Sequence, residues 1–89
     1  MFWDQCDWDP EGFDRGNTRH IAHNDVTPVE FQEVLDAIDR DDVEPSESGP
    51  GHLTAVGATS AGRPLRVVFE LDESPDFVLV RPIAAYEPD

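Results

Sequence analysis

The clearest pattern of apolar and polar positions lies between residues 27 and 38. Apolar side chains recur at i, i+3, i+4 and i+7, which places them on one stripe of a helix that faces a core. These positions are Phe31, Val34, Leu35 and Ile38. The stripe predicts a helix, and it leaves the acidic positions between its members toward water. Those acids are Glu30, Glu33 and Asp36.

The start of this helix carries its own signals. Thr27-Pro28-Val29-Glu30 is a capping box, with Thr27 as N-cap and proline at the first helical position. Val26 precedes the cap, so we expect it to pack against Phe31 as a hydrophobic staple. A shorter helix is expected over residues 17–23, with Asn17 as its N-cap, because asparagine accepts a hydrogen bond from an unpaired backbone N–H.

Strand signals dominate the second half of the chain. Three apolar runs cover residues 53–58, 64–71 and 77–83, and the short turns between them favour an antiparallel meander. In the middle run the apolar positions alternate with Arg66, Val68 and Glu70, which predicts one face on the core and one mixed face. Residues 44–51 have the Ser, Pro and Gly content of a loop.

These elements predict one α+β domain over residues 1–89. We expect an antiparallel sheet of about four strands, made of a short strand within residues 1–16 and the C-terminal meander, with both helices packed on one face. At this length a chain buries only about 60–65% of its unfolded surface, so a deep enclosed pocket is not expected.

Charge changes the functional picture. Twenty acidic residues face six arginines and no lysine, which gives a net charge of −14. Such a field repels phosphate backbones and disfavours broad electrostatic binding to nucleic acid. The balance fits a solvated surface, a basic protein partner or mimicry of DNA.

Cys6 is the only cysteine, so an intrachain disulfide is excluded. The first residues lack both a basic segment and a long apolar run, and we expect a cytoplasmic protein that does not enter a membrane. Asp7-x-Asp9-x-Glu11-Gly12 imitates the opening of a calcium loop, but Thr18 stands where the bidentate glutamate is needed. We therefore expect neither a metal nor another cofactor.

An ordered series of motifs runs along the chain. It comprises Trp8-Asp9, Gly16-Asn17-x-x-His20-Ile21-Ala22, Val26-Thr27-Pro28-x-Glu30, Gly62-Arg63 before Val67-Val68-Phe69, and Pro82-Ile83-Ala84-Ala85-Tyr86. In this series the chain resembles the BrnT-like toxins of type II toxin-antitoxin systems. The resemblance implies a fold related to the RelE ribonuclease toxins, an antitoxin partner and cleavage of RNA. Two departures remove positive charge: His23-Asn24-Asp25 replaces a Lys-His-Gly segment, and Glu87-Pro88-Asp89 replaces a basic tail.

RNA cleavage through the 2′-hydroxyl needs a base, an acid and a cation for the developing phosphorane charge. The candidates for proton transfer are His20 and His23, which lie three residues apart and would share a helix face. Candidates for phosphate are Arg63, Arg66 and Arg81, and Tyr86 is a candidate for hydrogen bonding or base stacking.

Each candidate also has a structural interpretation. His20 fits the edge of a core, and Tyr86 fits an anchor for the tail. Arg66 and Arg81 fit an open sheet face on which each arginine pairs with a carboxylate such as Glu70, and we expect that arrangement. Trp3 and Trp8 are expected to pack against the core or cover it.

Two hypotheses follow. In the first, the chain is a diverged family member that has lost catalysis and binds a cognate antitoxin or another basic protein, steered by the acids of the longer helix. In the second, it is an active, metal-independent ribonuclease that uses His20, His23, Arg66 and Arg81. If each arginine pairs with a carboxylate, no phosphate site remains, and we therefore expect no RNA binding at about 0.15 M salt, where the Debye length is about 8 Å.

Overall fold

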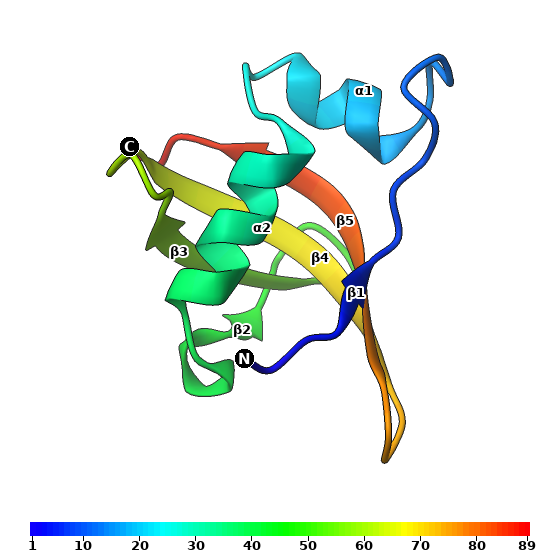
Figure 1. Cartoon of the computed structure of the whole chain (residues 1–89), viewed down its shortest axis with the longest axis vertical. Coiled ribbons are helices and arrows are strands. Elements are labelled where there is room, and N and C mark those ends of the chain that lie inside the picture. The colour runs from blue at the N-terminus through cyan, green and yellow to red at the C-terminus, as the bar shows by residue number, and fades with distance from the viewer.

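The computed structural model describes all 89 residues, Met1–Asp89. Two α-helices and one 3-10 turn pack with a single sheet (Figure 1). In chain order the elements are β1 (Gln5–Cys6), α1 (Asn17–Ala22), α2 (Pro28–Ala37), η1 (Arg40–Asp42), β2 (Glu44–Pro45), β3 (Leu53–Ala58), β4 (Pro64–Glu73) and β5 (Val78–Tyr86). The predicted α+β class and the predicted order of elements are confirmed.

The sheet has five strands in the order β1-β5-β4-β3-β2. The last three strands form the expected antiparallel meander, but β1 runs parallel to β5, so the sheet is mixed. β1 reaches the far side of β5 because α1 and α2 intervene between β1 and the meander. The second difference is β2, a fifth strand of two residues inside the segment predicted to be a loop, where Glu44 pairs with Thr54.

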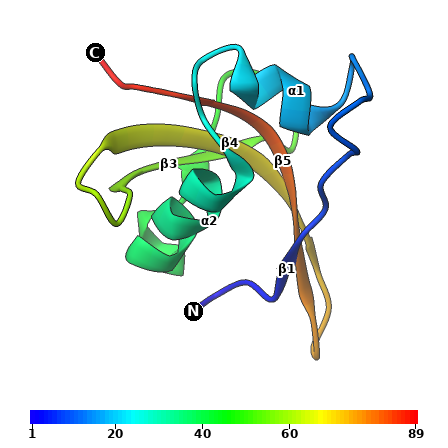
Figure 2. The same cartoon turned by 45° about the horizontal axis from the view of Figure 1, so that its top comes forward.

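One face of the sheet carries the core. Both helices supply it, because α1 packs on β5 while α2 lies across β3 and β4 (Figure 2). The predicted helix stripe is buried, and so are Leu65, Val67 and Phe69, the core-facing positions of β4. Val26 and Phe31 are buried in this same cluster, as the staple requires. Trp3 and Trp8 pack against it, and the Trp8 ring meets Phe31 edge-on at 5.4 Å.

α2 begins as the sequence predicts. The Thr27 hydroxyl accepts a hydrogen bond from the Glu30 N–H, and the Glu30 carboxylate accepts one from the Thr27 N–H. The helix approaches β3 closely at Gly57, where an added Cβ would lie 2.8 Å from Cγ2 of Ile38. A larger residue there would push the helix from the sheet.

The cap of α1 differs from the prediction. Gly16 is the N-cap and makes no side-chain cap, while Asn17 is the first helical residue. The Asn17 side chain instead ties loop to sheet: its Oδ1 accepts from the Asp9 N–H at 2.9 Å, and its Nδ2 donates to the Asp7 and Pro82 carbonyls. A sequence pattern cannot distinguish these uses, because both need a short amide side chain beside a turn.

The other face of the sheet is open over β4 and β5 and partly covered near β3. Val68 points to this side, yet it is 4% exposed, because residues 44–48 pass over it. A register shift at Val68/Phe69 marks an irregularity in the β4–β5 ladder. None of the helices is both long enough and apolar enough to cross a bilayer.

Candidate functional site

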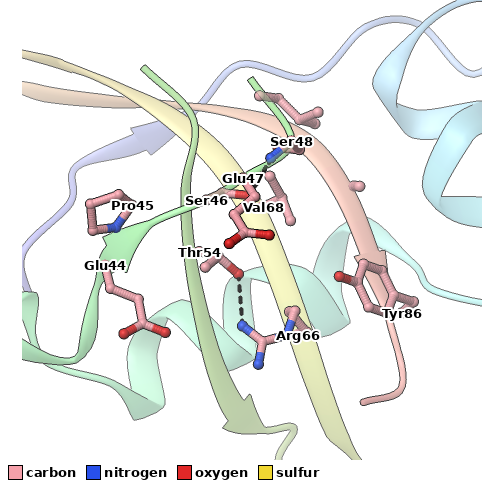
Figure 3. Close-up of a pocket in the computed structure, with 11 residues that line it drawn as sticks. Glu44, Pro45, Ser46, Glu47, Ser48, Thr54, Arg66, Val68 and Tyr86 are labelled. Atoms are coloured by element: carbon pink, nitrogen blue, oxygen red, sulfur yellow. Dashed lines mark hydrogen bonds between the residues drawn. The ribbon is translucent and has the colours of Figure 1, made fainter. Parts of the chain in front are cut away.

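The largest hollow of the molecule lies on the open face of the sheet (Figure 3). It is a groove of about 500 Å³ between the segment 44–48 and the strands β3, β4 and β5. Its floor is formed by Val68, Ile83 and Ala84, and polar side chains stand around that floor. The polar members are Glu44, Ser46, Glu47, Ser48, Thr54, Arg66 and Tyr86.

Arg66 is the only cation of this groove. Its Nη1 donates to Oγ1 of Thr54 at 3.2 Å, and the Thr54 hydroxyl in turn donates to the Val67 carbonyl at 2.9 Å. Arg66 forms no salt bridge with any carboxylate, which corrects the expectation that each arginine of this face would be paired. The neighbouring strand β3 offers Arg66 no acid, because its Cα partner there is Val56.

Tyr86 is the neighbour of Arg66 on the other side. The two residues are Cα partners in the β4–β5 ladder, and both line the groove (Figure 3). Tyr86 is 40% exposed, so its ring is a wall of the site rather than a buried anchor. A guanidinium beside an open aromatic ring is a pair suited to a carboxylate, a phosphate or another planar group.

The opposite rim is built by hydrogen bonds within the segment 44–52. The Ser46 N–H donates to the His52 carbonyl at 2.8 Å, and the hydroxyls of Ser46 and Ser48 lie 2.9 Å apart. Ser48 Oγ lies 2.8 Å from Nδ1 of His52. These bonds hold Glu44 and Glu47 at the rim, and neither carboxylate forms a salt bridge.

Arg63 does not belong to this groove. It donates from Nε to Glu87 at 2.9 Å and from Nη1 to Glu30 at 3.1 Å, and it also bonds the carbonyls of Asn24 and Asp25. These bonds to Glu87 and Glu30 raise the pKa of the Arg63 guanidinium above its ordinary value. The hydrogen bond from the Thr27 N–H lowers the pKa of Glu30, and Arg63 lowers it further. Arg63 thus joins its own turn to residues 24–25, to α2 at Glu30 and to the C-terminal tail at Glu87.

Arg81 is also neutralised. Its Nη2 lies 3.6 Å from Oδ2 of Asp72, and both side chains are exposed. Glu70, the partner expected for the arginines, is the Cα neighbour of Arg81 across the ladder but forms no salt bridge. Arg81 is therefore paired with a carboxylate as expected, but the carboxylate is that of Asp72 and not that of Glu70.

His20 lies in α1 and His23 is the C-cap residue of that helix, and both lie outside the groove. His20 borders a hollow formed with Asp9, Arg15 and Pro82, whereas His23 borders a different hollow beside Thr27 and Pro28. Both side chains are exposed. The two side chains thus border different hollows despite their spacing of three residues, and neither lines the hollow that contains Arg66.

The acids of α2 also differ from expectation. Only Asp36 is exposed, while Glu30 and Glu33 are half-buried. Glu30 is engaged by Arg63, and Glu33 accepts two hydrogen bonds from Ser60 at 3.2 and 2.8 Å. Glu30 and Glu33, which were expected to face water, instead bind the helix to the β3–β4 turn.

The sequence patterns missed the part of the site supplied by residues 44–48 and Thr54. Serine, proline and glutamate indicate a loop, and nothing in that composition specifies that the loop folds back over the sheet. No group of three or more histidine, cysteine, aspartate or glutamate side chains is arranged to hold a metal ion.

Comparison of the chain with protein-family models, with curated proteins and with solved structures found no match. The groove therefore has to be interpreted from its own chemistry. It offers one guanidinium, a tyrosine ring, several hydroxyls and two rim carboxylates above an apolar floor. No histidine lines the groove, although Nδ1 of His52 lies 2.8 Å from the rim hydroxyl of Ser48. The predicted set of His20, His23 and Arg66 is therefore not assembled there.

Proposed function

We propose that this chain is a diverged BrnT-like domain of a toxin-antitoxin system that has lost catalysis and binds a basic protein in the cytoplasm. A cognate antitoxin is the partner that the resemblance implies. The observation that carries the proposal is the scattering of the predicted catalytic set. His20 and His23 border separate hollows, Arg81 is paired with Asp72, and only Arg66 and Tyr86 meet in the groove.

The positions of the histidines relative to Arg66 argue against catalysis in the groove. A general base must lie within hydrogen-bond reach of the hydroxyl that it deprotonates, directly or through one water. A substrate phosphate held by Arg66 in the groove would have neither His20 nor His23 beside it, because neither lines that hollow. His52 does not line it either, and its Nδ1 lies 2.8 Å from the rim hydroxyl of Ser48. The proposal therefore keeps the fold and the groove but not the ribonuclease chemistry.

Charge supports a basic partner. Five of the 20 acidic side chains form salt bridges, which leaves 15 carboxylates without one. Two of these, Glu44 and Glu47, stand at the groove rim. An uncompensated negative field accelerates encounter with a positive surface and slows encounter with RNA.

The alternative function is RNA cleavage, and one observation favours it. Arg66 has no carboxylate partner, so a guanidinium remains free to contact a phosphate next to the Tyr86 ring. Arginine beside an aromatic ring is a common arrangement for single-stranded nucleic acid. The two functions make opposite predictions about which polyion enters the groove.

The test is a titration of the ¹⁵N-labelled protein, followed by NMR, at about 0.15 M salt, where distant charges are screened. The probes are a soluble peptide that alternates arginine with valine, its glutamate counterpart and a single-stranded RNA oligonucleotide. We expect the arginine peptide to shift amides of residues 44–48 and their neighbours, and the other two probes to shift none.

A double variant, Glu44→Gln with Glu47→Gln, should weaken binding of the arginine peptide. The control is Glu11→Gln, which removes one exposed carboxylate that lines a different hollow. Failure of the arginine peptide to bind would overturn the proposal. Binding of RNA that is lost in Arg66→Ala would replace it with the ribonuclease alternative.

A further inference from the structure

The outer edge of β3 is free over most of its length. β2 pairs with only the first two residues of β3, at Leu53 and Thr54, while β4 pairs with the whole strand on the other side. No strand lies outside Val56, Gly57 and Ala58. Val56 is 42% exposed, and Ala58 is also exposed.

Two hydrogen bonds fix which backbone groups point outward. At one end the His52 carbonyl accepts from Ser46, so residue 52 faces the β2 side. At the other end the Thr59 N–H donates to the Arg63 carbonyl, so residue 59 faces the β4 side. Because backbone direction alternates along a strand, Val56 and Ala58 direct their N–H and C=O groups away from the sheet.

The other edges of the sheet are protected. Along β5, beyond the short β1, the side chains of Asn17 and Asn24 donate to the carbonyls of Pro82 and Ala85. β2 is only two residues long and ends in Pro45, which has no N–H to offer. Natural sheets usually block an exposed edge with a charge, a proline, a bulge or a covering element.

The three free residues of the β3 edge carry none of these devices themselves. Val56, Gly57 and Ala58 carry no charge and no proline, and their ladder with β4 shows no register shift. The turn at the end of the strand is held in place by the bonds between Ser60 and Glu33. The edge is therefore an ordered template for an additional strand.

Charge selects the occupant. Asp36 is exposed and lines a hollow with Ala58 at one end of the edge, and Glu44 stands in β2 at the other end. Neither carboxylate forms a salt bridge. Edge-to-edge pairing of two copies would bring together two chains that each carry a charge of −14, which opposes a homodimer.

We infer that an extended basic segment of a partner protein adds to the sheet as a strand along Val56–Ala58. This inference rests on the proposed binding of a basic protein and identifies how that protein is held. Backbone hydrogen bonds from Val56 and Ala58 supply affinity, and arginine or lysine side chains at the ends of the added strand meet Asp36 and Glu44. An apolar side chain of the added strand lies beside Val56.

The experiment uses the intact protein and alters the ligand backbone. The alternating arginine–valine peptide is made in two N-methylated forms, one methylated at the arginines and the other at the valines. N-methylation removes an N–H donor, and in a strand only alternate residues face the neighbouring edge. We expect one form to lose at least about tenfold in affinity, equivalent to about 1.4 kcal/mol, while the other keeps most of it.

Amide hydrogen exchange supplies an independent readout. Bound peptide should protect the Val56 and Ala58 amides, and Asp36→Asn with Glu44→Gln should weaken binding more than Asp76→Asn in the distant β4–β5 turn. Equal effects of both methylated peptides, without that protection, would overturn strand addition while leaving basic-protein binding intact. No binding of the unmodified peptide would reject both proposals, and protein-concentration-dependent protection without peptide would indicate self-pairing instead.

Discussion

The guanidinium of Arg63 lies 3.1 Å from the carboxylate of Glu30, which joins the β3–β4 turn to the first turn of α2. The same Glu30 carboxylate closes the capping box with Thr27. Arg63, which was a candidate for phosphate binding from the sequence, therefore stabilises the fold instead. This relationship explains why the acidic first turn of α2 is not free to steer a partner.

Arg63→Gln should lower the melting temperature, because it removes the bonds to Glu30 and Glu87 and leaves the Asp25 carbonyl without its 2.7 Å donor. Arg81→Gln is the matched control, since Arg81 forms one exposed pair with Asp72. Differential scanning calorimetry should show the larger decrease for Arg63→Gln. Equal melting temperatures for the two variants would contradict this role of Arg63.

Acid should remove the stabilisation supplied by Glu30. The Thr27 N–H and Arg63 lower the pKa of Glu30 below its ordinary value of 4.5, so the folded state favours the ionised form. This stability is present above pH 4.5 and is lost as the pH falls through the lowered folded-state pKa. The free-energy difference between the wild type and Glu30→Gln, measured by urea unfolding, should shrink over that acid range.

The control for this pH series is Glu11→Gln, which alters an exposed glutamate without a hydrogen-bond partner. The stability difference between the wild type and Glu30→Gln should change more across this acid range than the difference between the wild type and Glu11→Gln. Equal changes for the two variants would show that the capping box and the Arg63 pair do not depend on ionised Glu30.

Alkali should destabilise the protein through Cys6. Burial, with a smaller effect from Asp36, raises the pKa of the Cys6 thiol from 9.0 to about 12. Between these values the unfolded thiol ionises while the folded thiol stays protonated, so unfolding releases a proton and stability falls as the pH rises. Cys6→Ala should flatten this alkaline decline in urea unfolding curves; an identical slope would contradict the buried, protonated thiol.

Asn17→Ala should cost about 1–3 kcal/mol, because it leaves polar groups of the loop without partners. The affected groups include the Asp9 N–H and the carbonyls of Asp7 and Pro82. Asn24→Ala is the matched control, since Asn24 makes one such bond, to the Ala85 carbonyl. Urea unfolding should show a smaller loss for Asn24→Ala, and the reverse order would contradict the role assigned to Asn17.

Local signals predicted the elements well. The capping box at Thr27 and the stripe from Phe31 to Ile38 specify α2 because each depends on neighbours within one or two turns. The alternation in β4 likewise identified the core face. The parallel pairing of Gln5 with Leu79 was not predictable in the same way, because it depends on where two helices return the chain.

The candidate site was less predictable, since it depends on contacts between distant residues. Arg63, Arg66 and Arg81 are similar in sequence context, yet one joins several segments, one bonds Thr54 and one pairs with Asp72. What separates them is the identity of the neighbour across each strand or turn. The covering segment 44–48 was missed because loop composition does not reveal where a loop lies.

The most direct test of the central claim is an RNA-cleavage assay with the purified protein. Structured and single-stranded RNAs are incubated at about 0.15 M salt, where the Debye length is about 8 Å, alongside Arg66→Ala and the double variant His20→Ala/His23→Ala. A non-catalytic domain should leave both RNAs intact, so that all three proteins match the buffer control. Cleavage by the wild type that is abolished in either variant would contradict the loss of catalysis.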